Sequence, residues 1–451
     1  MDLVIKNGTI VTASDSYKAD IGIMNGKIVA LGQDLSGDEN INAEDRYIFP
    51  GVIDVHTHME LPFMGTRSAD NFYTGTRSAA CGGVTTIIDF AIQGKNETVK
   101  EAIENRKNAA DSQVVIDFAL HAGLTRMIPE TLEELPEVIS DGVPSFKMFM
   151  TYRKEGFMVD DGFLYAVLQL VAEHGGLVGL HCENAAVLEH LVAKFLAEGK
   201  TDAYHHFLSK PNFVEGEATT RAITIAKAVN ASLYIFHLTC KEAWKAVASA
   251  RKHGFNIYSE TCPQYLTLTN EKYKQDDGVN YLISPPLRSQ EDINALWNGI
   301  KHDDIKIVST DHCPFTTAQK KMGDTFATVP NGLGGVETLL PIVYSEGVGK
   351  KRISLNQLVA LLSTNPANIF GLETKGSIAI GKDADLVIFN PLDKRILTIS
   401  MLHTECDYTP YEGMELQGYP ETTISRGSII FDKGKFSGEK GAGNFIKRRI
   451  T

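Results

Sequence analysis

The chain has 451 residues, 43% of them hydrophobic, which is enough for a large core and for one or two domains. Its formal net charge of −12 would be repelled by nucleic acid and by anionic membranes, so we expect neither as a partner. The sequence has no signal-peptide pattern and no apolar run long enough to cross a bilayer, and its six cysteines form no CxxC pair. We therefore expect a cytoplasmic protein with free thiols.

The two ends of the chain have the texture of short strands. LVIKNGTIV and IGIMNGKIVALG are interrupted at Asn7-Gly8 and Asn25-Gly26, and such pairs favour hairpin turns. Similar strands return after residue 370, in KGSIAIGKDADLVIFN and TTISRGSIIFDKGKF. The ends therefore predict one small β-sandwich, built from residues 1–51 and 373–451. Two interpretations of the final segment GAGNFIKRRIT stay open, a contact with a neighbouring subunit or a mobile terminus.

Between these ends, residues 52–372 alternate apolar runs with helical patterns such as DGFLYAVLQLVAEHG and KEAWKAVASARKHG. Near-continuous apolar strands that alternate with helices predict a parallel sheet covered by helices. Eight repeats predict a closed, TIM-like (β/α)₈ barrel. The eight runs are VIDVHTH (52–58), TTIIDF (85–90), VVIDFALHAG (114–123), SFKMFMTY (145–152), LVGLHCEN (177–184), SLYIFHLTC (232–240), NIYSETCPQY (256–265) and IKIVSTDHCPF (305–315).

Metal-ligating residue types gather where the predicted strands end. In such barrels the active site lies at the carboxyl ends of the strands. His56 and His58 end the first strand two residues apart, so both face the same side. His181, His237 and Asp311 end the fifth, sixth and eighth strands. A lone histidine is usually an ordinary core or surface residue, but four histidines and an aspartate on one rim predict a site for zinc, manganese, iron or cobalt.

Lys147 on the fourth strand is a further candidate. A bare ammonium beside divalent cations is repelled and has no electron pair to donate. Addition of carbon dioxide would make it a carbamate, an anion whose two oxygens can bridge two metals. A salt-bridged structural lysine and a Schiff base are the alternatives, but a Schiff-base enzyme such as an aldolase needs no histidine cluster. At the eighth strand the sequence leaves open whether Asp311 or His312 points inward.

Several motifs together resemble the hydantoinase/dihydropyrimidinase branch of the amidohydrolase superfamily over nearly the whole chain. They are FPGVIDVHTH, SFKMF, HCENA, FHLTC, ETCPQYL, SPPLR, STDHCPF and NGLGGVE. The resemblance implies a binuclear centre with two divalent ions, Zn²⁺ or alternatively Mn²⁺ or Co²⁺, in a homotetramer. It implies that one metal binds His56, His58 and Asp311, that the other binds His181 and His237, and that N6-carboxylated Lys147 and a hydroxide bridge them.

The same resemblance implies a reaction and the residues that serve it. The hydroxide would open the ring of 5-substituted hydantoins or dihydropyrimidines to give N-carbamoyl amino acids, and overall resemblance favours D-hydantoins. Tyr152 would donate to the developing oxyanion, and Asp311 would carry the proton to the departing nitrogen. Backbone groups of Ser284 and Asn331 would bind the imide.

The sequence also bears on whether the chain resembles other members of the superfamily. Dihydroorotases carry an arginine where this chain has Glu60, so orotate-like carboxylates are disfavoured. Allantoinase stays an alternative because it shares the metal ligands. A non-catalytic dihydropyrimidinase-like scaffold protein is the other, although the full ligand set argues against it. Phe63, Met64 and Phe157 are candidate walls of an apolar substituent pocket.

Overall fold

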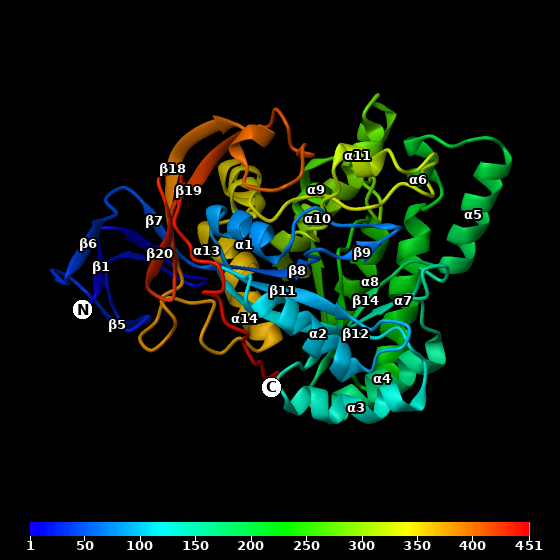
Figure 1. The fold of residues 1–451 in the computed structure, drawn as a ribbon, viewed down its shortest axis with the longest axis horizontal. Helices are drawn as coiled ribbons and strands as arrows, with labels where there is room; N and C mark the ends of the chain where they lie inside the picture. The colour runs from blue at the N-terminus through cyan, green and yellow to red at the C-terminus, as the bar shows by residue number, and fades with distance from the viewer. Residues whose placement is uncertain (451) are drawn as a thin grey trace.

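Eight parallel strands form a barrel in a computed structural model that describes residues 1–450 (Figure 1). Neighbouring strands follow one another in chain order, and the last meets the first where Thr57 pairs with His312. This confirms the predicted (β/α)₈ barrel. The strands are β8 (Val52–Thr57), β11 (Val84–Ile92), β12 (Asp117–Gly123), β13 (Ser145–Phe149), β14 (Leu177–His181), β15 (Leu233–Ile235), β16 (Ile257–Thr261) and β17 (Ile307–Val308).

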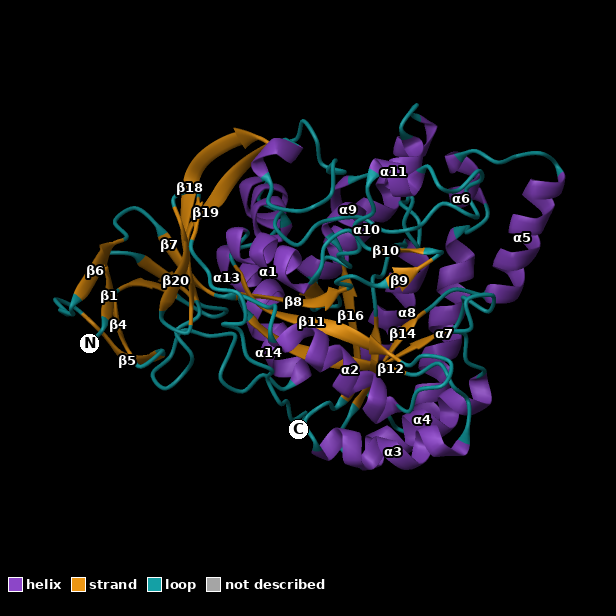
Figure 2. Ribbon diagram, in the orientation of Figure 1, coloured by secondary structure: helices purple, strands orange, loops and turns teal. Residues whose placement is uncertain are grey.

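Helices cover the outside of this barrel (Figure 2). Capping boxes fix the first turns of α2, where Thr98 pairs with Glu101, and of α10, where Ser289 pairs with Asp292. No helix of residues 1–450 is long and apolar enough to cross a membrane. The helices are α1 (Phe72–Cys81), α2 (Val99–Asp111), α3 (Pro129–Ser140), α4 (Asp161–Glu173), α5 (Ala185–Ala197), α6 (Ala203–Leu208), α7 (Asn212–Ala228), α8 (Lys241–Lys252), α9 (Pro263–Thr267), α10 (Gln290–Lys301), α11 (Thr317–Lys320), α12 (Leu339–Val343), α13 (Leu355–Val359) and α14 (Asn365–Phe370).

A β-sandwich built from both chain ends stands beside the barrel, as predicted (Figure 1). Its core joins aliphatic side chains of both ends, including Ile5 and Ile21 from one and Leu386 and Ile424 from the other. One sheet contains β1 (Leu3–Lys6), β4 (Asp20–Met24), β5 (Lys27–Gly32) and β6 (Glu39–Asn42). The other contains β2 (Thr9–Val11), β3 (Ser16–Lys18), β7 (Tyr47–Pro50), β18 (Leu386–Ile396), β19 (Glu415–Ser425), β20 (Ser428–Asp432) and β21 (Lys435–Phe436).

One of the two predicted hairpins is wrong. Asn25-Gly26 does join paired strands, β4 and β5, and both residues have the positive φ that such a turn needs. Asn7-Gly8 instead connects β1 to β2, which lie in different sheets. Asn7 also has a positive φ, of 65°, and its backbone N–H donates to Asp20 Oδ1 at 3.0 Å. The turn residues are therefore used to cross between the sheets.

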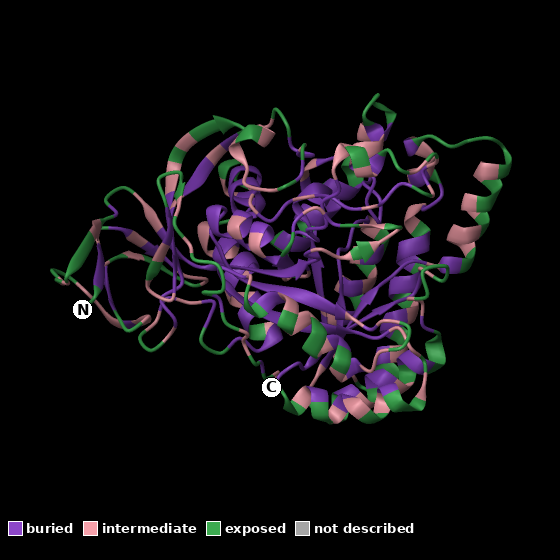
Figure 3. Ribbon diagram, in the orientation of Figure 1, coloured by how far each residue is buried: buried purple, intermediate pink, exposed green. Residues whose placement is uncertain are grey.

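The C-terminal tail packs against this chain's own barrel, which neither interpretation of the sequence anticipated. The backbone of residues 444–446 pairs with Phe118 of β12, with N···O distances of 2.9 and 2.7 Å. The buried Arg448 guanidinium donates to the Leu120 carbonyl and to Ser145 Oγ, the latter at 2.8 Å. Figure 3 shows that the barrel strands are buried, and the tail helps to cover them.

Arg448→Met should lower the free energy of unfolding by about 1–3 kcal/mol, because it leaves the buried Leu120 carbonyl and Ser145 hydroxyl without this donor. Lys447→Met is the matched control, since Lys447 is exposed, and it should change stability by less than about 0.5 kcal/mol. Denaturant-induced unfolding of both variants measures the difference. Equal effects of the two substitutions would show that the tail is not held by Arg448.

Candidate metal centre

A cavity opens at the carboxyl ends of the barrel strands. It gathers nearly all the side chains that the sequence singled out. Those that line it are His56, His58, Phe63, Lys147, Tyr152, Phe157, His181, His237, Ser284, Asp311 and Asn331, together with Leu61, Ile92, Phe149, Ile283, Cys313 and Gly332, which the sequence analysis did not name.

His56, His58 and Asp311 form one potential metal site. Asp311 Oδ1 lies 3.0 Å from His56 Nε2 and 3.1 Å from His58 Nε2. His56 Nε2 is buried and nevertheless has no hydrogen bond of acceptable geometry. Two imidazole nitrogens and a carboxylate oxygen that converge within 4.8 Å of one another are the donor set of a divalent transition metal. These three residues therefore fit a metal ion.

His181 and His237 form the second pair, from adjacent strands. His181 Nδ1 lies 2.9 Å from His237 Nε2, and burial is the main cause that lowers the pKa of both rings. Neutral imidazoles are the form that ligates metals. The geometry thus suits a second cation, although two protein ligands alone would leave it under-coordinated.

Lys147 lines the same cavity as both groups and is 1% exposed. Its amine faces aromatic rings, with Nζ 3.9 Å from the Phe236 ring centre and 5.1 Å from that of Phe90. Among residues 1–450 no carboxylate lies within ion-pair distance of this amine, so it is not the salt-bridged lysine of the alternative interpretation. Burial lowers the pKa of Lys147 to about 8, which makes the neutral amine accessible near neutral pH.

Three residues at the cavity adopt left-handed backbone conformations. The φ angles are 65° at Tyr152, 37° at His237 and 53° at Asp311. Such conformations disfavour residues with a Cβ and persist only where the surrounding structure enforces them. Their concentration around one cavity indicates that the chain accepts local strain to aim these side chains.

Buried carboxylates that the sequence analysis did not name orient the imidazoles from behind. Glu260 on β16 hydrogen-bonds His56 Nδ1, the Tyr234 hydroxyl and the His237 backbone N–H. Glu183 Oε2 lies 2.7 Å from His181 Nε2. Each carboxylate occupies one ring nitrogen and leaves the other turned to the cavity, which is how histidine ligands are usually held. The sequence signal that could have identified Glu260 is a carboxylate inside a predicted barrel strand, in the segment SETC.

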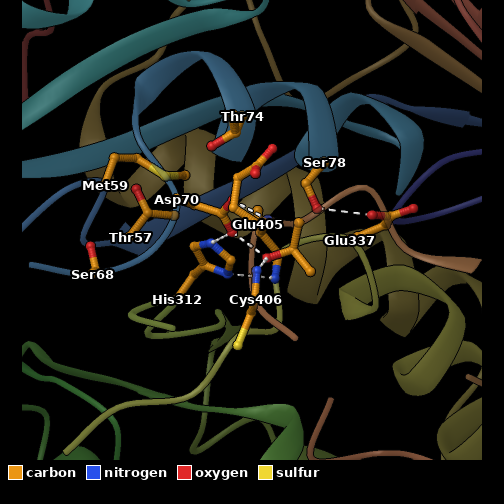
Figure 4. Close-up of polar contacts among 12 residues, drawn as sticks. Thr57, Met59, Ser68, Asp70, Thr74, Ser78, His312, Glu337, Glu405 and Cys406 are labelled. Atoms are coloured by element: carbon orange, nitrogen blue, oxygen red, sulfur yellow. Dashed lines mark hydrogen bonds and ion pairs between the residues drawn. The ribbon is translucent and has the colours of Figure 1, made fainter. Parts of the chain in front are cut away.

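The orientation of the eighth strand is resolved in favour of Asp311. His312 points away from the cavity, and Figure 4 shows it facing Asp70. Its Nδ1 accepts the backbone N–H groups of Gly335 and Val336 at 3.0 and 3.2 Å, so Nε2 carries the proton and donates to Asp70 Oδ2 at 3.1 Å. This network anchors the turn that carries Asp311.

Ser284 and Asn331 lie on two loops at one edge of the cavity. Ser284 Oγ accepts a hydrogen bond of 2.6 Å from Lys210 Nζ, while Asn331 Oδ1 is buried without a partner among residues 1–450. Tyr152 completes this edge, its ring 5.1 Å from that of His181. The edge therefore presents polar groups beside the candidate metal ligands.

An apolar wall adjoins this edge. Phe63 and Phe157 line the cavity and lie near the Tyr152 ring, with centroid distances of 5.8 and 6.5 Å. Met64 does not line the cavity, and its sulfur lies 3.9 Å from Asn331 Nδ2. Glu60 also lies outside the residues that line the cavity.

Comparison with known proteins places the chain in a family. The model of the Amidohydrolase family matches residues 47–430. A D-hydantoinase of Geobacillus stearothermophilus is 44% identical over 99% of this chain and 97% of its own, and one of Ralstonia pickettii is 42% identical over 100% and 99%. The chain belongs to the amidohydrolase family, in its hydantoinase/dihydropyrimidinase branch.

Solved structures of this branch share the whole architecture. A dihydropyrimidinase from Brevibacillus agri superimposes with a TM-score of 0.98 at 42% identity, covering 100% of this chain and 99% of that one. An L-hydantoinase from Arthrobacter aurescens gives 0.92 at 30% identity, covering 99% and 100%. For this amidohydrolase, membership of the branch favours a metal-dependent hydrolase over a Schiff-base aldolase or a scaffold protein.

Proposed function

We propose that this amidohydrolase opens the ring of 5-substituted hydantoins or dihydropyrimidines to give N-carbamoyl amino acids. The observation that carries the proposal is the convergence of four imidazoles, Asp311 and Lys147 at one cavity, beside the Tyr152 hydroxyl. The relatives named D-hydantoinase and dihydropyrimidinase support the substrate class.

Two divalent cations, zinc in our proposal, would be held by these donors. His56, His58 and Asp311 would hold one, and His181 and His237 the other. Lys147 would join them after its neutral amine adds carbon dioxide, which forms an N–C bond, releases the amine proton and leaves a carbamate anion. Its burial, its lowered pKa and its lack of an ion-pair partner among the described residues support this modification. When bound, the cations supply a water of lowered pKa and polarise the ring carbonyl.

The residues of this chain supply the proton transfers and the orientation. Burial raises the pKa of Tyr152 well above its usual value, so the hydroxyl stays protonated and can donate to the oxygen that gains charge. Burial alone would raise the pKa of Asp311, but His56 and His58 hold it well below its usual value, so its carboxylate is ionised and can accept a proton. Asp311 would then pass that proton to the departing ring nitrogen.

The apolar wall supports a substrate that carries an apolar substituent. A cavity with Phe63, Phe149 and Phe157 on one side accommodates an alkyl or aryl substituent at carbon 5, because apolar surface is buried there. Ser284 and Asn331 on the polar edge would bind the imide. We also propose a cytoplasmic homotetramer, on the resemblance to this branch.

A panel of five ring substrates tests this function. We expect hydrolysis of hydantoin and dihydrouracil, faster turnover of 5-phenylhydantoin, and little turnover of dihydroorotate. Allantoin is the discriminating member, because allantoinase shares the ligands. Ring opening is followed by the appearance of the N-carbamoyl product, with chelator-treated protein as the control. Preference for allantoin would replace the proposed function with allantoinase, and no hydrolysis by zinc-, manganese- or cobalt-loaded protein would refute it.

A further inference from the structure

A buried lysine outside the metal centre supports the polar edge of the cavity. Lys320, the last residue of α11, is 1% exposed. Its Nζ donates hydrogen bonds to the backbone carbonyls of Leu282, Pro330 and Gly332 at 2.9, 2.7 and 2.9 Å. An ammonium has three protons, so every donor of Lys320 is used on backbone.

These carbonyls belong to the two loops that form the polar edge. The first loop continues from Leu282 to Ser284, and the second contains Asn331 and Gly332. The Gly332 backbone N–H also donates to the Leu282 carbonyl at 2.9 Å. Lys320 therefore bridges two segments about fifty residues apart in sequence, and both place backbone beside the cavity.

Lys320 places a charged group in a buried space, which destabilises the folded state unless the charge is compensated. Among residues 1–450 no carboxylate lies within ion-pair distance of its amine, and burial lowers the pKa of Lys320 to about 7. Burial of an unpaired cation opposes folding, and an apolar side chain would fill the volume at lower cost. The lysine adds what an apolar residue lacks, namely three donors that fix the separation of two loops.

The neighbouring residue has a parallel but separate role. Gln319 Nε2 donates to Thr66 Oγ1 at 2.8 Å and to the Arg67 carbonyl at 2.6 Å. Both acceptors lie in the hairpin of β9 (Pro62–Phe63) and β10 (Thr66–Arg67), which carries Phe63 of the apolar wall. The short helix α11 thus touches the polar edge through Lys320 and the apolar wall through Gln319.

We propose that Lys320 is a positioning residue for substrate recognition: its ammonium holds the 282–284 and 330–332 loops so that their backbone groups can bind the imide edge of the ring. The inference rests on the proposed function and extends it. Because the imide edge is common to all the ring substrates, Lys320 should affect them alike. Gln319 should affect chiefly those with a large substituent at carbon 5.

Steady-state kinetics of Lys320→Gln and Lys320→Met on hydantoin and 5-phenylhydantoin test the proposal. We expect KM for both substrates to rise about ten-fold, because the hydrogen bonds from the two loops to the imide edge of the ring would be weakened. We expect kcat to stay nearly unchanged. Metal content per chain should equal that of the wild type. Lys321→Met is the matched control, because Lys321 is exposed and adjacent, and it should retain the wild-type KM. Gln319→Ala should raise KM more for 5-phenylhydantoin than for hydantoin.

A merely structural role would lower the melting temperature and the active fraction without changing KM. An unchanged KM in folded, metal-loaded Lys320→Gln protein therefore overturns the proposal, and so does failure of that variant to fold, which would make Lys320 a residue of general stability. An equal rise of KM in Lys321→Met overturns it as well. A wild-type protein that hydrolyses neither substrate would instead refute the proposed function.

Discussion

Lys147→Ala protein should lose at least part of its metal and nearly all of its activity. Lys147 lines the same cavity as both imidazole groups, and without its proposed carbamate the pair His181 and His237 offers only two protein ligands. Metal ions supply several kcal/mol of transition-state stabilisation, so kcat should fall by about 10³-fold or more. Elemental analysis of the purified variant and turnover of hydantoin measure the two effects.

A short carboxylic acid such as acetate or propionate should partly restore turnover of Lys147→Ala by occupying the vacated space with an anion. Lys154→Ala is the control, since Lys154 is exposed and seven residues away, and it should behave as the wild type. Mass spectrometry of intact wild-type protein under carbon dioxide should show the added mass of one carboxyl group. Full metal content and activity in Lys147→Ala would refute the bridging role.

The barrel could be predicted because its signal is local. The barrel strands are buried along nearly their whole length on both faces and therefore read as largely apolar runs, and helices between the runs have an amphipathic period. The sequence could not show that Asn7-Gly8 connects strands of different sheets. Such a pair indicates a turn with positive φ angles, but it does not say which strands pair with each other. The tail could not be placed either, since Arg448 finds its acceptors 328 and 303 residues away in sequence, in Leu120 and Ser145.

The candidate ligands could be named from strand ends, but the residues that hold them could not. Alternation placed His56 and His58 on one face, whereas at the eighth strand it left Asp311 and His312 open. The structure resolves that choice through the contacts of His312 with Asp70, Gly335 and Val336, which come from distant loops. Glu183 lies only two residues from His181, but Glu260 behind His56 belongs to another strand, so that pairing depends on the closed barrel.

Tyr152→Phe should lower kcat by about 10²–10³-fold and leave the bound metal unchanged. The substitution removes one hydroxyl donor and keeps the ring, so the contacts with Phe63 and His181 persist. KM should change little if the hydroxyl acts on the oxygen as charge develops there, because that interaction is stronger in the transition state than in the bound substrate. Steady-state kinetics together with metal analysis separates these effects.

Tyr165→Phe provides the matched control, since Tyr165 on α4 is 45% exposed and does not line the cavity. The pH dependence adds a second criterion. Because burial raises the pKa of Tyr152, the hydroxyl keeps its proton through the neutral and mildly alkaline range, and the ratio of wild-type to Tyr152→Phe kcat should stay constant there. Near-wild-type activity in Tyr152→Phe would remove the tyrosine from the mechanism. A loss of metal in the same variant would instead indicate that Tyr152 helps to hold the metal centre. The left-handed backbone of Tyr152, which lies beside His181, is compatible with that role.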